Sequence, residues 1–212
     1  MTPVPYQVTE MFERALCAYT GAKYAVAVNS GTAAIMLACQ WQFQGTRSEY
    51  DEADGTHSNS VHCPKRTYIS VPQAIIHAGG WPDFRHLDWK GEYQLYPLPV
   101  WDSARRFTSG MYRPHQFQCV SFAAAKILGA EQGGAILHDN EEADAWFRRM
   151  RFDGRTEGVN PLEDTFDLVG HHCLMIPSVA ATLLVRLYHL PKHNEDLPYY
   201  EYPDLSKHKA FQ

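Results

Sequence analysis

The sequence has 212 residues, of which 45% are hydrophobic and 20% charged, and its 19 basic and 24 acidic residues give a net charge of -5. This composition is typical of a soluble globular protein with a substantial core, and the acidic balance disfavours a protein that binds nucleic acid through its phosphates. Five scattered cysteines without CxxC spacing favour a reducing, cytoplasmic setting, and the lack of a leader pattern or a long apolar run predicts neither secretion nor a membrane span.

Helical and strand patterns alternate along the chain, as they do in α/β proteins. Apolar residues at three- and four-residue spacing indicate helices, and short apolar runs between turn formers indicate strands. In chain order the predicted elements are helix 8–20, strand 24–28, helix 31–42, exposed polar loop 43–63, strand 66–70, helix 71–80, strand 81–89, strand 96–102, strand 118–122, strand 133–139, helix 140–152 and buried helix 176–190. Residues 191–212 lack periodicity, and we expect them to wrap over a neighbour or to stay mobile.

The stretch NSGTAA at residues 29–34 lies between a predicted strand and a predicted helix. Backbone N–H groups at a helix N-terminus and the hydroxyls of Ser30 and Thr32 suit a bound phosphate, and Gly31 permits close approach. An ordinary helix cap at Ser30 is the alternative interpretation.

Two further residues have the chemistry of a cofactor site. Asp102 ends an apolar strand, where a carboxylate can hold a protonated ring nitrogen, cap a helix or pair with Arg105 or Arg106. Lys126 lies in the apolar run SFAAAKILGAEQGGA; a desolvated lysine has a lowered pKa and can form a Schiff base, whereas an exposed loop lysine does neither. A phosphate cradle, an acid and an amine are together what pyridoxal 5'-phosphate requires.

In their order and spacing these motifs resemble the DegT/DnrJ/EryC1/StrS family, the sugar aminotransferases of the fold-type-I pyridoxal-phosphate superfamily. The similar segments cover most of residues 12–155 and are FERALCAYTGAKYAVAVNSGTAAIMLA, RTYISVPQAIIHAGGWPDF, VWDSA, SFAAAKILGAEQGGAIL and FRRMRFDGR. The resemblance implies that residues 1–190 form the large domain of a fold-type-I PLP-dependent transferase, an α/β fold with a mostly parallel central sheet flanked by helices. Residues 191–212 would be a tail, without the family's C-terminal small domain.

The resemblance also implies roles for single residues. Lys126 would form the internal aldimine with pyridoxal 5'-phosphate and shuttle protons, and Asp102 would pair with the pyridinium nitrogen. The other implied cofactor-binding residues are Ser30, Gly31, Thr32 and Ser121 at the phosphate, Tyr68 stacked on the ring, Arg105 near the ring hydroxyl and His172 toward the phosphate of a partner subunit. No metal site is predicted, because the His and Cys residues lack the spacing of a ligand motif.

Some positions depart from the family pattern. Arg105 stands where Gln or His is usual, His172 where Asn is usual, and Leu174 where Arg is usual. The stretch between Asp88 and Asp102 is shorter than in the family, which predicts a reduced sheet.

The predicted activity is PLP-dependent transfer of an amino group from an amino acid, glutamate, to a keto group on a nucleotide-linked sugar, by a cytoplasmic homodimer with shared active sites. A sugar dehydratase is one alternative, although such relatives carry histidine in place of Lys126. Another PLP reaction on a small carbonyl or amine substrate and a non-catalytic protein of this fold are the others.

Overall fold

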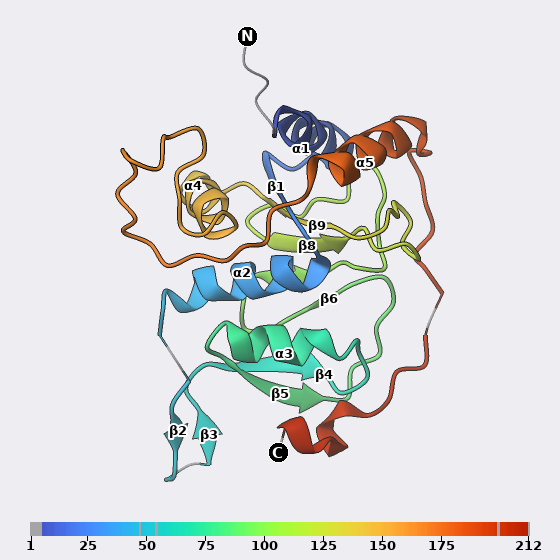
Figure 1. The fold of residues 1–212 in the computed structure, drawn as a ribbon. Coiled ribbons are helices and arrows are strands. Elements are labelled where there is room, and N and C mark those ends of the chain that lie inside the picture. The colour runs from blue at the N-terminus through green and yellow to red at the C-terminus, as the bar shows by residue number, and fades with distance from the viewer. Residues whose placement is uncertain (1–5, 47, 54, 199, 212) are drawn as a thin grey trace.

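The computed structural model describes residues 6–46, 48–53, 55–198 and 200–211. Its centre is a mixed five-stranded sheet (Figure 1). The strands lie in the order β1 (Tyr24–Val28), β9 (Gly134–His138), β8 (Phe117–Ser121), β7 (Val100–Asp102) and β6 (Tyr93–Gln94). β1, β8 and β7 run in one direction, whereas β9 and β6 are antiparallel to their neighbours.

Helices cover both faces of this sheet. α1 (Gln7–Thr20) and α5 (Pro177–His189) pack on one face, and α2 (Gly31–Phe43) and α4 (Glu141–Met150) pack on the other (Figure 1). The side chains of β1 alternate accordingly, because successive residues of a strand point to opposite faces. Ala25 and Ala27 join the α1–α5 core, while Val26 and Val28 join the α2 core.

A second, smaller sheet lies beyond α2. α3 (Ser70–His77) packs on α2 and on the parallel pair of β4 (Ser60–Pro64) and β5 (Trp81–Arg85). The short connection from β5 to β7 contains only β6, and the β4–β5 pair forms a sheet separate from the five-stranded one. The remaining elements are the hairpin of β2 (Tyr50–Asp51) and β3 (Thr56–His57) and the 3-10 helices η1 (Leu205–Lys207) and η2 (Lys209–Phe211).

Most predicted elements are confirmed. The helices expected over 8–20, 31–42 and 71–80 correspond to α1, α2 and α3, and the strand expected over 24–28 is β1. Gly21 ends α1 in the left-handed conformation, with φ of 85°, which a residue without a side chain adopts easily. No helix in the described ranges is both long and apolar enough to cross a membrane.

The strand predicted at 66–70 is wrong. The strand in this region is β4, which ends at Pro64, and its buried residues Val61 and Cys63 pair with β5. The stretch 66–69 instead forms the turn that leads into α3, with Val71 N donating to Tyr68 O at 3.0 Å. The β-branched and aromatic residues of RTYIS are typical of strands, but here they lie in the turn that leads into α3.

Other boundaries are also corrected. The polar stretch 43–63 is not a simple loop, since it holds the β2–β3 hairpin and most of β4; residues 47 and 54 lie outside the described residues. The strand expected over 81–89 stops at Arg85. The one expected over 96–102 begins at Val100, because residues 96–99 form a turn before it.

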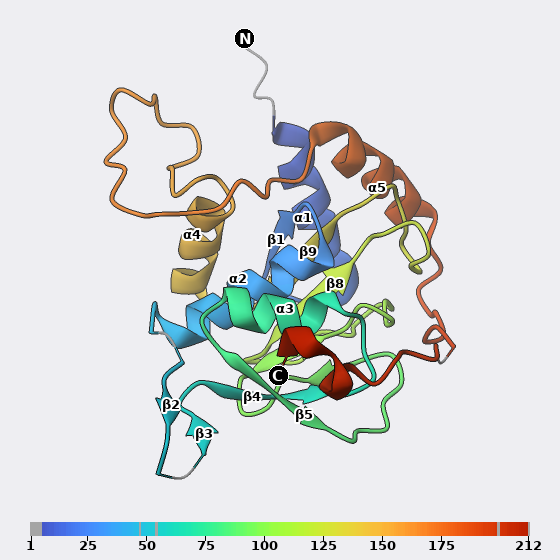
Figure 2. The same cartoon turned by 60° about the horizontal axis from the view of Figure 1, so that its bottom comes forward.

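The C-terminal predictions also differ from the structure. The helix predicted over 176–190 is α5, but it is buried on one face only, with Val185 61% exposed and Tyr188 86% exposed. The tail packs along its own chain (Figure 2). Near its end the Phe211 ring contacts the Phe84 ring. Residues 199 and 212 of the tail lie outside the described residues.

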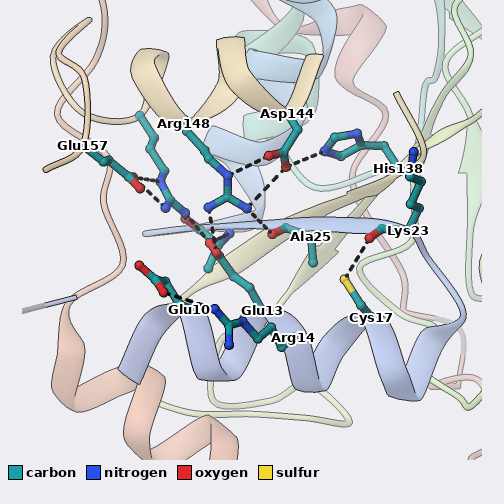
Figure 3. A network of polar contacts seen from close by, with 12 residues as sticks. Glu10, Glu13, Arg14, Cys17, Lys23, Ala25, His138, Asp144, Arg148 and Glu157 are labelled. Atoms are coloured by element: carbon teal, nitrogen blue, oxygen red, sulfur yellow. Dashed lines mark hydrogen bonds and ion pairs between the residues drawn. The ribbon is translucent and has the colours of Figure 1, made fainter. Parts of the chain in front are cut away.

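A buried ionic network fixes α1 and α4 to β1 (Figure 3). Arg148 Nη1 donates to Glu13 Oε2 at 2.8 Å, and Arg151 binds the other Glu13 oxygen and donates to Ala27 O at 2.7 Å. Two further carboxylates complete the network. Glu157 accepts from Arg151 at 2.7 Å, and Asp144 accepts from Arg148 at 2.7 Å. The network therefore holds the end of β1, two residues before the NSGTAA turn.

We expect Glu13→Ala to lower the free energy of unfolding by about 3–5 kcal/mol, because the variant removes the buried anion that compensates Arg151. The control is Glu10→Ala on the same helix, where the exposed pair with Arg14 spans 3.6 Å and should contribute less than about 1 kcal/mol. Urea denaturation of the cofactor-free protein measures both. Equal urea midpoints for the two variants would contradict the assigned role of the network.

Candidate active site

The N-terminus of α2 meets the end of β8. Gly31 is the first residue of the helix, and a Cβ placed on it would lie 2.9 Å from Ser121 Cβ, so this approach requires glycine. Ser30 caps the helix by accepting from Ala33 N at 3.1 Å. The Thr32 and Ser70 hydroxyls are 2.7 Å apart and link the first turns of α2 and α3. Amides without intrahelical partners and several hydroxyls thus gather at one point, as an anion site requires.

Asp102 is buried at the end of β7, with 6% of its surface exposed. Its carboxylate accepts from Tyr93 Oη at 2.7 Å and from Ala104 N at 2.9 Å, and Tyr93 Oη also bonds Thr67 Oγ1 at 2.6 Å. Burial raises the pKa of Asp102, although these donors oppose the shift. In the described part of the chain no lysine or arginine forms an ion pair with this carboxylate.

Lys126 lies on the loop that follows β8. Burial lowers the pKa of its amine; the negative charge of Asp102 opposes this shift, and the positive charge of Arg105 adds to it. The loop is held in place, because Ala130 N donates to Phe122 O at 2.7 Å and Arg186 of α5 donates to Gly129 O. A partly desolvated amine therefore lies within electrostatic reach of a buried carboxylate.

The remaining predicted residues are placed less centrally. Tyr68 is 59% exposed at the turn before α3, and its ring contacts no other aromatic ring in the described residues. The His172 side chain is 80% exposed, and its Nδ1 lies 2.9 Å from Asp153 Oδ2. Arg105 donates to Pro198 O in the C-terminal tail. The cofactor roles of these three residues stay predictions.

Tyr93, Thr67 and Ser70 belong to this site and were not found by sequence reasoning. Tyr93 is buried and donates to Asp102, while Thr67 and Ser70 bond to other hydroxyls near the site. The stretch KGEYQLY around Tyr93 carries no motif, and its pairing with Asp102 follows from the antiparallel register of β6 and β7. The contact between Tyr93 and Asp102 can be recognised only when the pairing of β6 with β7 is known.

The residues present fit pyridoxal phosphate. A buried carboxylate without a cationic partner is stabilised by a protonated ring nitrogen, and the glycine-lined start of α2 suits a phosphate. Lys126 supplies the amine that the aldehyde needs. The side chains that would hold the group are Asp102 and Lys126, with Ser30, Thr32 and Ser121 at the phosphate end.

A large hollow lies elsewhere in the described structure. A cavity of about 1040 Å³ opens at the C-terminal end of α2. Its aromatic lining includes Trp41, Trp81 and Trp146, and it contains neither Asp102 nor Lys126.

Comparisons with known proteins agree with this fold. The model of the DegT/DnrJ/EryC1/StrS aminotransferase family matches residues 4–97 and 109–196. A search of curated proteins finds no match to the sequence.

Several solved structures have a fold similar to that of this chain. DesV from S. venezuelae, in complex with a ketimine intermediate, is 21% identical with a TM-score of 0.63 over 90% of this chain and 57% of that chain. Helicobacter pylori PseC, an aminotransferase involved in the biosynthesis of pseudoaminic acid, is 17% identical with a TM-score of 0.66 over 87% and 58%. NtdA from Bacillus subtilis, with bound cofactor PMP, is 19% identical with a TM-score of 0.67 over 86% and 48%. The chain spans less than two thirds of each of these proteins, and the likeness confirms the fold.

We expect Asp102→Asn to stabilise the cofactor-free protein at pH 8 and to weaken its binding of pyridoxal phosphate. The folded state raises the pKa of Asp102, so the ionised carboxylate destabilises the fold above that pKa, and the penalty disappears as the pH falls toward the unfolded value of about 3.9. An amide is tolerated because Tyr93 Oη can donate to Thr67 and accept from the new amide nitrogen.

Urea denaturation at pH 8 and near pH 4 measures the difference in stability between Asp102→Asn and the unchanged protein. The control is Asp88→Asn, at an exposed position between β5 and β6. A gain in stability that persists unchanged at pH 4 would contradict a titration of Asp102.

Proposed function

Because the chain belongs to the DegT/DnrJ/EryC1/StrS aminotransferase family, we propose that it is a cytoplasmic, pyridoxal-phosphate-dependent aminotransferase that moves an amino group from an amino acid to a keto group. Glutamate is the proposed donor, and a nucleotide-linked keto sugar is the proposed acceptor. The likeness of the fold to PseC, an aminotransferase involved in the biosynthesis of pseudoaminic acid, supports a sugar acceptor.

The observation that carries this proposal is the presence of a buried carboxylate, Asp102, within electrostatic reach of a partly buried amine, Lys126. Asp102 is a buried carboxylate that receives only neutral hydrogen bonds, and Lys126 is an amine whose pKa is lowered by burial. A buried charge of this kind costs free energy in the absence of a cationic ligand. The arrangement is therefore suited to a ligand with a basic ring nitrogen at one end and a carbonyl at the other.

Each residue then has a physical task. Bound pyridoxal phosphate would supply the aldehyde that reacts with amines and the ring that withdraws electrons from them. Asp102 would keep the ring nitrogen protonated by opposing its charge, and Tyr93 orients Asp102 through the hydrogen bond of 2.7 Å. Lys126 Nζ would supply the amine that binds the aldehyde, and it would carry a proton to and from the substrate carbon that bears the amino group.

The phosphate end depends on backbone geometry. The first amides of α2 point away from the helix, and Ser30, Thr32 and Ser121 surround them with hydroxyls. The absence of a side chain at Gly31 keeps the helix start close to β8. This end would anchor the cofactor without a lysine or arginine side chain.

We expect Lys126→Ala to abolish the visible absorption band that forms when pyridoxal phosphate is added to the protein, and to lower the transamination rate by at least about 10²–10⁴-fold, the range for loss of a positioned proton-transfer group. In the unchanged protein, glutamate should bleach that band. Lys90→Ala, which removes an exposed lysine from the connection before β6, should change neither result.

Two outcomes would count against the proposal. A band of equal intensity in Lys126→Ala would show that another amine binds the aldehyde. Binding without bleaching by any amino acid would exclude transamination while leaving the cofactor site intact.

We also propose that the protein forms a homodimer with shared active sites. The family resemblance assigns His172 to the phosphate of a partner subunit, and its 80% exposed side chain leaves it open to such a contact. The apolar residues Leu162, Phe166 and Val169, exposed on the preceding loop, offer a surface for a second copy.

Mixing two inactive variants tests this arrangement. If Lys126→Ala and His172→Ala subunits exchange, one of the two sites in a mixed dimer keeps both residues, so activity should return to a fraction of the unchanged protein's. Sedimentation measures the oligomeric state in parallel. A monomer that retains full activity would rule out shared sites.

A further inference from the structure

Three buried side chains form a line of hydrogen bonds between the two sheets. Thr67 follows β4 of the two-stranded sheet, Tyr93 lies on β6 at the edge of the five-stranded sheet, and Asp102 ends β7. Thr67 Oγ1 and Tyr93 Oη are 2.6 Å apart, and Tyr93 Oη donates to Asp102 Oδ2 at 2.7 Å. The three residues are 1%, 5% and 6% exposed, so both hydrogen bonds are shielded from water.

The pairing of β6 with β7 makes this line possible. Tyr93 and Asp102 are directly opposite each other in the antiparallel register, and the side chains of such a pair lie on the same face. The connection from β5 to β7 contains β6 as its only strand, so the short connection places the tyrosine beside the strand that ends in Asp102.

The ionised carboxylate fixes the direction of the hydrogen bonds. A carboxylate only accepts, and a phenol has a single proton to donate. Burial raises the pKa of Tyr93 well above its usual value, so the proton stays on the phenol. Because Tyr93 gives that proton to Asp102, the hydroxyl of Thr67 must donate to Tyr93. A donor that itself receives a hydrogen bond is polarised and donates more strongly, so Thr67 acts on the carboxylate through Tyr93.

A second link joins Tyr93 to the turn before α3. The Trp89 ring packs edge-on against the Tyr93 ring, with centroids 4.7 Å apart, and Trp89 Nε1 donates to Arg66 O at 3.1 Å. Arg66 and Thr67 directly precede Tyr68. The position of Asp102 and the position of this turn are therefore fixed relative to the same phenol ring.

We propose that Thr67 is a positioning residue, which acts through Tyr93 to hold the Asp102 carboxylate and couples it to the turn that carries Tyr68. This inference rests on the proposed function for its purpose, because Asp102 would pair with the ring nitrogen of the cofactor and Tyr68 would stack on the same ring. The hydrogen bonds of 2.6 and 2.7 Å and the link through Trp89 carry the geometry.

The first test uses the cofactor-free protein, so it depends neither on transamination nor on cofactor binding. The protonation of Asp102 is followed over a range of pH by the carbon-13 signal of its carboxyl group, which is identified by its loss in Asp102→Asn. Tyr93→Phe keeps the ring and removes one donor to the ionised carboxylate. It should move the midpoint upward by about 1–2 pH units, the range for a hydrogen bond to a charged group.

Thr67→Val, which removes the hydroxyl and keeps nearly the same shape, should move the midpoint in the same direction by a smaller amount. Thr67→Ser keeps a hydroxyl and should restore the midpoint of the unchanged protein. In the Tyr93→Phe background, Thr67→Val should add no further shift, since the hydroxyl between the two groups is absent. Tyr96→Phe, at a 57% exposed position in the same connection, is the control and should leave the midpoint unchanged.

None of these variants adds or removes a charged group near Asp102. The other titratable groups that interact with its charge stay in place, and they are Cys63 on β4, Cys119 on β8, Arg105 and Lys126 on the loops after β7 and β8, and Tyr202 in the tail. A difference in midpoint between variants therefore reports the two hydroxyls.

Binding of pyridoxal phosphate is the second readout. We expect Thr67→Val to raise the Kd about 2- to 10-fold, the effect of one neutral hydrogen bond, and Thr67→Ser to bind as the unchanged protein does. Equal Kd values for Thr67→Val and Thr67→Ser would overturn the coupling to the cofactor site.

The midpoints decide the rest. An unchanged midpoint in either Tyr93→Phe or Thr67→Val would overturn the inference, and so would a Thr67→Val shift of equal size with and without the Tyr93 hydroxyl. If the unchanged protein binds no pyridoxal phosphate, the proposed function fails, yet the midpoints still show whether Thr67 acts on Asp102 through Tyr93.

Discussion

Moving a carboxylate from water into a protein interior costs free energy unless a cation or several donors compensate the charge. Among the described residues three acidic side chains are buried, namely Glu13, Glu92 and Asp102. Glu13 and Glu92 are each bound by two arginines, whereas Asp102 receives one phenol and one amide N–H. Of these three buried carboxylates, Asp102 is the one without an ion pair to lysine or arginine, and it lies at the end of β7. This imbalance marks the place where a cationic ring would be stabilised.

The two compensated carboxylates determine where the site residues lie. Glu13, through Arg151, holds the carbonyl of Ala27 at the end of β1 and thereby the turn that starts α2. Glu92 accepts from Ser103 Oγ at 2.7 Å and from Arg106 at 2.5 Å, so it fixes the residues directly after Asp102. Arg106 also binds Asp196 and carries this constraint to the tail that follows α5. Two ionic networks in separate parts of the chain therefore position the phosphate end and the ring end of the site.

The sequence was sufficient for features that depend on local pattern. The strand–turn–helix of residues 24–43 follows from a buried run, a serine cap and an apolar helix, and the structure confirms all three. Features that depend on pairing between distant segments were not predictable. Tyr93 reaches Asp102 only through the register of β6 and β7, and RTYIS carries strand-forming residues although Tyr68 begins a turn. The tail has no periodicity because single side chains, rather than a helical face, attach it to the body.

The two ends of α2 explain why the hollow lined by Trp41, Trp81 and Trp146 is not the candidate site. The helix has 13 residues and is about 20 Å long, so its ends lie in different environments. Its N-terminus presents free amides and a partial positive charge, which favour a phosphate, whereas its C-terminus carries the opposite partial charge. The hollow lies at that second end, and its described lining includes Trp41, Trp81 and Trp146. The direction of the helix therefore favours a phosphate-bearing cofactor at the N-terminus of α2, beside Gly31.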